Sequence, residues 1–223
     1  METENKKFNP YLIVIIVLVL AVAGFAYDKW GGNILPASVK DTDKSSTKVE
    51  TLEGDIQIGS DDAPVTIVEY FSYFCGYCRL FKEETEPKII ENYVSTGKVK
   101  LILRIFPPFE TGLAVLCAND QGKFFEYHDA LFERVEEIQE VEDLKTIAKD
   151  ISLNESQFNE CFDSQKYLAK AQAWYDQGQK DFEGSGVPEE QRGTPAFFVN
   201  GEAFVGAHPY ESFVDIIERK LAE

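Results

Sequence analysis

Two cysteines separated by two residues, Cys75 and Cys78 in the stretch FSYFCGYC, most directly predict chemistry in this chain. Such a pair can bind a metal, form a structural bridge, or alternate between dithiol and disulfide. The pair lies where an apolar run gives way to a helical pattern. This predicts Cys75 at a helix N-terminus, where the dipole and free N–H groups favour a thiolate. Cys78, one turn further along, is expected to be more buried, so the pair has the attacking and resolving thiols that redox exchange requires.

A metal site and a purely structural bridge are the alternatives for this pair. A structural zinc site takes four ligands, usually including a second close pair. Elsewhere the sequence has the isolated Cys117 and Cys161 and the lone His128 and His208, so we expect no metal. A bridge within four residues closes almost no loop and would add little stability. Redox exchange is therefore the favoured interpretation.

A glutamate and a proline point to the same chemistry. Glu69 lies six residues before Cys75 inside an apolar, strand-like run, where a carboxylate is costly unless it has a function. The alternative for Glu69 is a sheet-edge position that faces water. The stretch RGTPAFFVNG, residues 192–201, places Thr194 and Pro195 at the start of another apolar run. Because proline lowers the cost of a cis peptide bond, this stretch predicts a cis bond before Pro195.

The elements that must position these residues alternate between strands and helices. Short β-branched and aromatic runs predict strands, and longer amphipathic stretches predict helices. The order of these strands and helices along the chain predicts an α/β domain with a helical insertion. The predicted elements are a strand at 65–71, a helix from 75 to about 96 kinked at Pro87, a strand at 99–106, helices within about 111–183, strands at 196–199 and 203–205 joined by a turn at Asn200-Gly201, and a helix at 210–221.

Together these motifs resemble the DsbA-like thiol:disulfide oxidoreductases of the thioredoxin superfamily. FSYFCGYC looks like their active-site turn, Glu69 falls where the family has a buried acid, and GTPAFFVNG looks like their cis-proline loop. The resemblance covers about residues 54–223. It implies an α/β, thioredoxin-like fold with a helical insertion, and an enzyme that exchanges protein thiols and disulfides without a cofactor.

The resemblance also implies a role for each site residue. Cys75 would form the mixed disulfide with a client protein, Cys78 would resolve it, and Glu69 would relay protons to Cys78. The client backbone would be held by strand-like hydrogen bonds at the cis-proline loop. The residues assigned to client binding are Thr194, Pro195, Gly76 and Tyr77.

Two departures from the family pattern bear on the direction of exchange. The dipeptide between the cysteines is Gly76-Tyr77, whereas strong oxidases of the family carry Pro-His, so one source of thiolate stabilisation is missing. Gly-Tyr with a threonine before the cis-proline is also seen in the DsbC-like isomerase branch, which carries an N-terminal dimerisation domain. We predict an oxidase of folding proteins. A reductase or isomerase of the same fold is the alternative, and a non-catalytic, chaperone-like binding module is a third.

The two remaining cysteines, Cys117 and Cys161, fall on apolar helix faces of the insertion. An exported protein leaves few thiols free, so with the redox pair accounted for we predict a structural disulfide between them. Two buried free thiols are the alternative. His128 is predicted to pack inside the insertion, and His208 to lie at a turn near the last helix.

The N-terminus carries the signals for location. Residues 11–27 (YLIVIIVLVLAVAGFAY) are 17 residues without a charge, preceded by two lysines. They predict a single membrane-spanning helix with residues 1–10 in the cytoplasm. A cleaved signal peptide is the main alternative, because Ala21-Val22-Ala23 has the small-x-small pattern of a cleavage site. A buried core helix is a third possibility.

With either a membrane-spanning helix or a cleaved signal peptide, the rest of the chain is exported. Residues 28–53 are polar and predict a flexible linker. Residues 54–223 are then a catalytic domain tethered to the cell membrane, facing the periplasm or the cell exterior. The partners implied are unfolded or partly folded exported proteins with cysteines, and a DsbB-like or VKOR-like membrane redox partner.

The charge balance excludes one class of partner. Asp and Glu outnumber Lys and Arg by 39 to 22, which gives a net charge of −17. Nucleic-acid binding needs clustered Lys and Arg, so we expect no nucleic acid.

Overall fold

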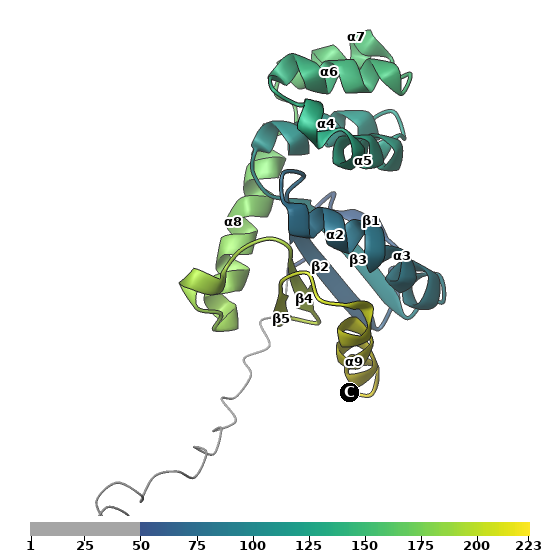
Figure 1. The fold of residues 1–223 in the computed structure, drawn as a ribbon, viewed down its shortest axis with the longest axis vertical. Helices are drawn as coiled ribbons and strands as arrows, with labels where there is room; N and C mark the ends of the chain where they lie inside the picture. Colours follow the sequence, from purple (N-terminus) through teal and green to yellow (C-terminus); the bar gives the residue numbers. More distant parts are fainter. Residues whose placement is uncertain (1–49) are drawn as a thin grey trace, which may run out of the picture. The chain divides into compact units, whose positions relative to one another are not determined.

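Residues 50–223 are described by the structure, a computed structural model, and they are organised around a five-stranded mixed sheet (Figure 1). The strand order is β1-β3-β2-β4-β5; β2 and β3 run parallel, and the other neighbouring pairs are antiparallel. β1 has three residues, too few for a periodic pattern, and was not predicted; the other strands were. The strands are β1 (Ile56–Ile58), β2 (Val65–Phe71), β3 (Val99–Ile105), β4 (Ala196–Val199) and β5 (Glu202–Val205).

Helices cover both faces of the sheet, and a further group of helices forms the predicted insertion (Figure 1). The helices are α2 (Gly76–Glu84), α3 (Glu86–Ile89), α4 (Phe109–Asn119), α5 (Phe124–Glu133), α6 (Val141–Asp150), α7 (Glu155–Asp163), α8 (Leu168–Ser185) and α9 (Tyr210–Leu221). On one face Phe81 of α2 and Phe213 of α9 pack against Phe197 of β4. On the other face Phe182 of α8 packs against Phe198. The sheet is therefore buried on both sides, which explains the near-continuous apolar runs of β2 and β3.

Side chains of the central strand β2 alternate between two hydrophobic clusters, one on each face. Phe71 belongs to the cluster that contains Phe81 of α2, whereas Tyr70 belongs to the cluster that contains Phe182 of α8. Because successive side chains of a strand point to opposite faces, Glu69 shares the α2 face with Phe71. Two adjacent polar residues, Glu69 and Tyr70, are thus buried in different environments.

The predicted helix from 75 to about 96 is interrupted in the structure. α2 ends at Glu84, α3 carries Pro87 in its first turn, and a π-helical turn, η1 (Ile90–Val94), completes the segment. Proline is tolerated in a first turn because the N–H groups there have no partner within the helix. The Thr85 N–H still donates to the Phe81 carbonyl at 2.9 Å, so the junction keeps a backbone hydrogen bond.

A disulfide joins two helices of the insertion. Cys117 on α4 and Cys161 on α7 are bonded, with an S–S length of 2.03 Å and a sequence separation of 44 residues. Closing a loop of that length stabilises a fold by about 4 kcal/mol through the entropy of the unfolded chain. The two cysteines are therefore not the buried free thiols that the sequence left as an alternative.

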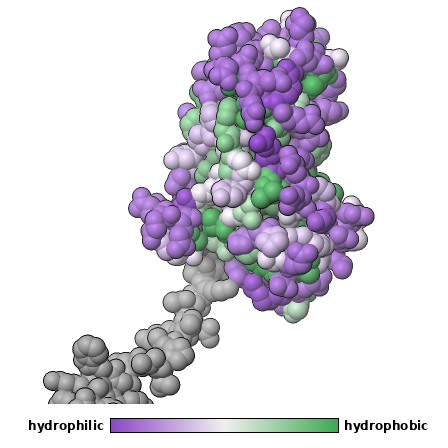
Figure 2. Space-filling model, in the orientation of Figure 1, coloured by the Kyte–Doolittle hydropathy of each residue, from purple (hydrophilic) through white to green (hydrophobic). Residues whose placement is uncertain are grey.

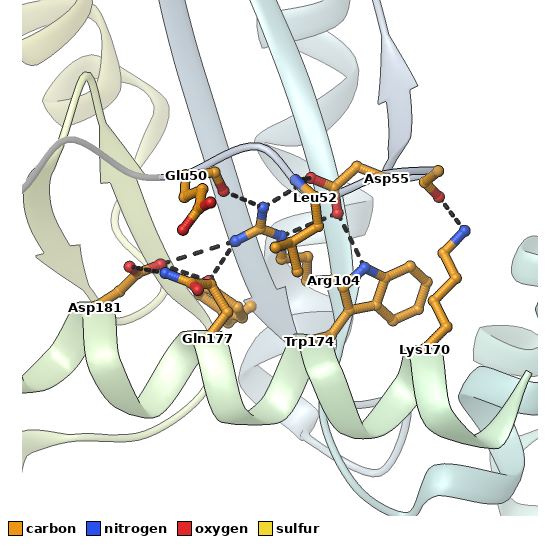
Figure 3. A network of polar contacts seen from close by, with 10 residues as sticks. Glu50, Leu52, Asp55, Arg104, Lys170, Trp174, Gln177 and Asp181 are labelled. Atoms are coloured by element: carbon orange, nitrogen blue, oxygen red, sulfur yellow. Dashed lines mark hydrogen bonds and ion pairs between the residues drawn. The ribbon is translucent and has the colours of Figure 1, made fainter.

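A buried arginine on β3 organises a polar network on the α8 face (Figure 3). Arg104 is 0% exposed; its Nε and Nη2 donate to the Asp55 carboxylate at 3.1 and 2.7 Å, and its Nη1 donates to the Tyr70 hydroxyl at 2.6 Å. That hydroxyl donates to Asp181 of α8 at 2.5 Å, and Asp181 lies 3.8 Å from Arg104. We call Arg104, Asp55, Asp181 and Tyr70 the Arg104 cluster. Each charge in it is paired and hydrogen-bonded, the condition under which a buried charge is tolerated.

The Arg104 cluster also holds the segment that leads into the domain. The Glu50 carbonyl accepts a hydrogen bond from Arg104 at 2.5 Å, and Asp55 accepts one from the Trp174 indole of α8 at 2.9 Å (Figure 3). The folded domain therefore begins before residue 54, and residues 50–53 belong to it, not to a flexible linker as predicted.

The other predicted N-terminal elements lie outside the described residues. They are the cytoplasmic residues 1–10, the membrane-spanning run 11–27 and the linker up to residue 49. Within residues 50–223, none of the helices is sufficiently long and apolar to span a membrane.

Candidate active site

Cys75 lies between the end of β2 and the start of α2. Its backbone is extended (φ −92°, ψ 113°), and its Sγ caps the helix by accepting a hydrogen bond from the Cys78 N–H at 3.4 Å. The Cys75 N–H donates to the Ser72 carbonyl at 3.1 Å, which closes the turn between strand and helix. The sulfur thus faces the positive end of the helix dipole, as the sequence predicts.

The two thiols, both free in the structure, differ in their surroundings. Burial raises the pKa of the Cys75 thiol. Hydrogen bonds with the side chains of Thr194 and Cys78 and with backbone N–H groups of the first turn outweigh this effect and lower the pKa below its usual value. Cys78 is 0% exposed, and burial together with its hydrogen bond to Cys75 raises the pKa of its thiol well above the usual value. Cys75 is therefore the thiol that ionises readily, and Cys78 is held protonated.

The loop before β4 meets the cysteine pair. Sγ of Cys75 donates to the Thr194 carbonyl at 3.1 Å, a contact across 119 residues of sequence. The Thr194–Pro195 peptide bond is cis. The Pro195 carbonyl accepts from the Gly206 N–H at 2.8 Å, which ties the loop to the end of β5. The two motifs that the sequence analysis singled out are thus side by side.

Glu69 lies on the central strand, beneath the pair. It is in register with Leu103 of β3 and Phe197 of β4 and is 3% exposed, so the alternative of a water-facing edge position is wrong. Burial raises the pKa of its carboxyl well above the usual value; Glu86 adds to the rise, Lys82 opposes it, and Cys75 adds a smaller rise. A carboxyl in this state can hold a proton at neutral pH and exchange it with a nearby group.

Three charged side chains beside Glu69 were not predicted. Glu86 of α3 is 3% exposed, and Lys82 of α2 lies 3.3 Å from it. Lys82 also lies 3.2 Å from Asp129 of α5. We call Glu69, Lys82, Glu86 and Asp129 the Glu69 cluster. The spacing of Lys82 and Glu86 is the i,i+4 spacing of ordinary surface pairs, so the sequence carries no sign that Glu86 is buried.

The two histidines occupy the predicted places. His128 is 2% exposed inside the insertion, with its Nδ1 2.8 Å from the Tyr73 hydroxyl. Burial lowers its pKa well below the usual value, and Lys82 lowers it further, so the ring is neutral. His208 precedes α9, with its Nε2 2.9 Å from the Val205 carbonyl.

Two cavities open on either side of Cys75. One of about 400 Å³ lies between the cis-proline loop and α8, with Thr194 and Tyr175 in its walls. The other, of about 340 Å³, lies between the start of α2 and the insertion, with Gly76 and Ile138 in its walls. An extended chain that passes over Cys75 can therefore place side chains on both sides of the sulfur.

The surface around the pair is partly apolar. Phe74, Tyr77 and Leu80 are 48%, 69% and 40% exposed. Figure 2 shows hydrophilic side chains over most of one face and hydrophobic ones gathered near its middle, where Figure 1 shows α2 and the loop to β4. Apolar area next to a reactive sulfur suits a partner with exposed hydrophobic side chains.

A sequence profile described as thioredoxin matches residues 51–219 of the chain. The chain belongs to the thioredoxin family. Its α/β sheet, its helical insertion and the position of its cysteine pair are those that the family resemblance led us to expect, so the predicted fold class is confirmed for the described residues.

Two curated relatives that align over most of the chain are named as disulfide bond formation proteins. Disulfide bond formation protein D of Bacillus subtilis is 24% identical over 183 residues, which cover 77% of this chain and 79% of the relative. A probable disulfide bond formation protein D of Bacillus anthracis is 24% identical and aligns over 99% of both chains. This thioredoxin-family chain is accordingly a DsbA-like protein thiol:disulfide oxidoreductase.

Solved structures agree with that assignment. Oxidised BdbD of Bacillus subtilis superposes with a TM-score of 0.65 and 25% identity, covering 78% of this chain and 96% of the other. α-DsbA1 of Wolbachia pipientis gives a TM-score of 0.66 and 25% identity, covering 80% and 96%.

Proposed function

We propose that this chain forms disulfide bonds in exported proteins and that Cys75 and Cys78 are its redox pair. In the oxidised enzyme the two sulfurs form a disulfide. A client thiolate attacks Sγ of Cys75, a client–Cys75 disulfide forms, and Cys78 leaves as a thiolate that takes a proton. A second client thiolate then attacks the client sulfur, and Cys75 leaves as a thiolate. Two electrons pass from the client, which gains a disulfide, to the enzyme, which becomes a dithiol.

Reoxidation runs the same exchange against a membrane partner that carries its own disulfide, of the DsbB-like or VKOR-like kind. The Cys75 thiolate attacks that disulfide. The Cys78 thiol then loses its proton to Glu69 and attacks Sγ of Cys75, which releases the partner as a dithiol. The disulfide of the enzyme is restored, and no cofactor is bound by the enzyme itself.

The contrast between the two thiols is the observation that carries this proposal. The pKa of Cys75 is lowered by hydrogen bonds that outweigh its burial, and the reduced form of the enzyme is thereby stabilised. A redox pair whose reduced form is stabilised is a stronger oxidant, because its disulfide is more readily opened by a client thiolate. The contrast thus favours an oxidase over a reductase.

Client binding in this proposal uses the surface around Cys75. Thr194 offers its backbone N–H and carbonyl to an extended client segment, as a strand edge would, and the cis Pro195 sets the direction of that backbone. Gly76 and the exposed Tyr77 lie at the start of α2 beside the sulfur. The apolar surface selects clients that are unfolded or partly folded, because these expose hydrophobic side chains next to their cysteines.

The location of the enzyme is a proposal that rests on the sequence. We propose that residues 11–27 anchor the chain, with residues 1–10 in the cytoplasm, a linker after the anchor, and the catalytic domain outside. The uncharged run of 17 residues supports the anchor. Fractionation with alkaline extraction tests it: the full chain should remain in the membrane pellet, and a cleaved product in the soluble fraction would contradict the anchor.

Equilibration of the full chain with glutathione buffers tests the function. We expect a reduction potential less negative than about −200 mV, the range of oxidising family members. A potential near that of thioredoxin, about −270 mV, would instead support a reductase. Cys75→Ser should abolish oxidation of a reduced, unfolded client. The matched control Cys117→Ser/Cys161→Ser, which removes both sulfurs of the other disulfide and leaves no unpaired thiol, should leave the activity per folded molecule unchanged.

A further inference from the structure

A second buried acid, Glu86, faces Glu69 beneath the active-site helix. Both side chains belong to residues that are 3% exposed, Glu69 on β2 and Glu86 on α3. Burial is the largest cause of the raised pKa of Glu69, and the charge of Glu86 is the next. Burial also raises the pKa of Glu86, and Lys82 opposes that rise. Two carboxyl groups in one buried site cannot both ionise easily.

One cation joins this pair of acids to solvent. The side chain of Glu86 is 4% exposed and lies 3.3 Å from Lys82 Nζ. The Lys82 side chain is 24% exposed, and the same Nζ lies 3.2 Å from Asp129, whose side chain is 54% exposed. Exposure therefore increases stepwise from Glu86 to Lys82 to Asp129, so Lys82 connects the buried acids to water.

The other titratable groups around the pair are neutral or belong to the redox site. Burial raises the pKa of Tyr73, and Tyr127, Asp129, Glu69 and Glu86 raise it further, so the phenol stays protonated. His128, hydrogen-bonded to Tyr73, is held neutral by burial. The groups that face the pair are Lys82, Cys75 and Cys78 from α2 and its cap, Tyr73 from the loop after β2, and Asp129 and His128 from α5.

We propose that Glu86 is a positioning residue for the redox reaction: its negative charge keeps the proton on Glu69, and Lys82 connects the two acids to solvent. Glu86 touches neither sulfur and acts through Glu69. This inference rests on the role of Glu69 given under the proposed function, and it adds the residues that set when Glu69 can accept a proton.

The proton balance follows from this arrangement. When the enzyme disulfide opens, the Cys78 thiolate takes the proton of Glu69, and the pair of acids regains one from water beside Lys82. When the disulfide forms, the pair first loses its proton to that water, and the ionised Glu69 then takes the proton of the Cys78 thiol. One proton enters or leaves for each turnover of Cys78, and the two electrons move between sulfurs alone.

The test follows the resolving step against pH. Cys75 of the full chain, in mild detergent, is converted to its mixed disulfide with glutathione, and release of glutathione is followed between pH 4 and pH 9 by acid quenching and mass spectrometry. Release requires Cys78 to lose its proton, so the rate rises with pH as Glu69 ionises. The midpoint of that rise reports the pKa of Glu69.

Glu86→Gln and Lys82→Met should move the midpoint in opposite directions. Glu86→Gln removes the neighbouring negative charge, so the midpoint falls by about one pH unit; Lys82→Met removes the positive charge, so it rises by about one unit. The matched control Glu84→Gln removes the same charge from an exposed position two residues away and should leave the midpoint unchanged.

Glu69→Gln separates failure of the inference from failure of the proposed function. Suppose that Glu69→Gln abolishes the rise of the release rate with pH, but that Glu86→Gln leaves the midpoint of this rise where it is in the wild type. Glu86 then has only a structural role, and this inference is wrong. If Glu69→Gln itself leaves the profile unchanged, the proton relay of the proposed function is wrong as well. Should Glu86→Gln fail to fold, Lys82→Met decides by the same measurement, with the Glu69 carboxyl titrated directly by ¹³C NMR.

Discussion

The two faces of the central sheet each bury charge, and they do so differently. On the α8 face, each carboxylate of the Arg104 cluster accepts hydrogen bonds from two side chains. Asp55 accepts from Arg104 and Trp174, and Asp181 accepts from Tyr70 and Gln177. On the α2 face, the Glu69 cluster places two buried carboxyls beside one lysine, which Asp129 also contacts. Both clusters contain more carboxyl groups than cations. The carboxylates of the Arg104 cluster accept hydrogen bonds from Arg104, Trp174, Tyr70 and Gln177, whereas Glu86 of the Glu69 cluster accepts from Lys82.

This difference separates a structural role from a chemical one. Burial raises the pKa of Asp181, but hydrogen bonds from Tyr70 and Gln177 and the charge of Arg104 oppose that rise. The Arg104 cluster ties together β2, β3, α8 and the segment before β1 (Figure 3). A carboxyl with a raised pKa holds a proton that it can exchange, and Glu69 is such a group on the face that bears the cysteines. Adjacent residues of one strand thus serve different purposes because alternation sends them to opposite faces.

The largest effect on stability is expected from removing Arg104, the cation of the Arg104 cluster. Arg104→Met leaves Asp55 and Asp181 buried without their partner, and loss of one member of a buried ion pair costs about 3–5 kcal/mol. Urea unfolding at pH 7 measures it. Lys100→Met, which removes a partly exposed cation from the same strand, should cost less than about 1 kcal/mol. A similar small loss for Arg104→Met would mean that the cluster does not stabilise the domain.

Whereas Arg104→Met should destabilise the fold, Glu69→Gln should stabilise it and should slow the resolving step of the redox reaction. Loss of the proton acceptor should slow glutathione release at pH 7 by about 10²-fold. Because the pKa of Glu69 is raised in the folded state, its native form is fully favourable below the usual pKa of a glutamate and loses stability as pH rises through the raised value. Urea midpoints of wild type and variant should therefore agree at pH 4, and the variant should be higher at pH 8. A variant less stable at pH 8 would contradict this.

Tyr70→Phe tests whether the stability of the Arg104 cluster depends on the Tyr70 hydroxyl, which bridges Arg104 and Asp181. The hydroxyl accepts from Arg104 at 2.6 Å and donates to Asp181 at 2.5 Å. Hydrogen bonds to charged groups contribute more than neutral ones, so its removal should lower the unfolding free energy by about 2 kcal/mol. The pH profile of glutathione release should not move. A shift in that profile would mean that the two clusters are coupled through the sheet.

The smallest expected effect concerns the segment that the Arg104 cluster holds. Gly54 has φ +72°, and a Cβ there would lie 2.6 Å from Lys170 Nζ, which donates to the Gly54 carbonyl. Gly54→Ala should cost about 1 kcal/mol for the backbone alone, and more if Lys170 is displaced. Gly97→Ala has the same φ (+73°) with open space around it, so the difference between the two variants measures the Lys170 contact. Equal costs would show that this contact adds nothing.

Much of the fold and the core of the candidate site could be predicted from the sequence. The strands at 65–71 and 99–106 were predicted because both are long apolar runs, and the second ends one residue earlier, at Ile105. Cys75 was placed at a helix start because strand and helix patterns meet there. The helix break fell at Thr85, two residues before the predicted kink, and β1 was missed because three residues carry no period. The buried Arg104 gave no signal at all, because an arginine is usually exposed.

The sequence by itself determined the chemistry available: a cysteine pair at a helix start, an acid in an apolar strand and a threonine-proline dipeptide before another strand. Such signals are local, since they depend on residue types within one element. Only the tertiary structure decided that Thr194 meets Cys75, that Glu69 lies on the central strand and not at an edge, and that Glu86 and Lys82 lie beside it. Burial and electrostatic coupling depend on which elements pack together, and pairs such as Cys75 and Thr194, 119 residues apart, acquire their interaction only when the chain has folded.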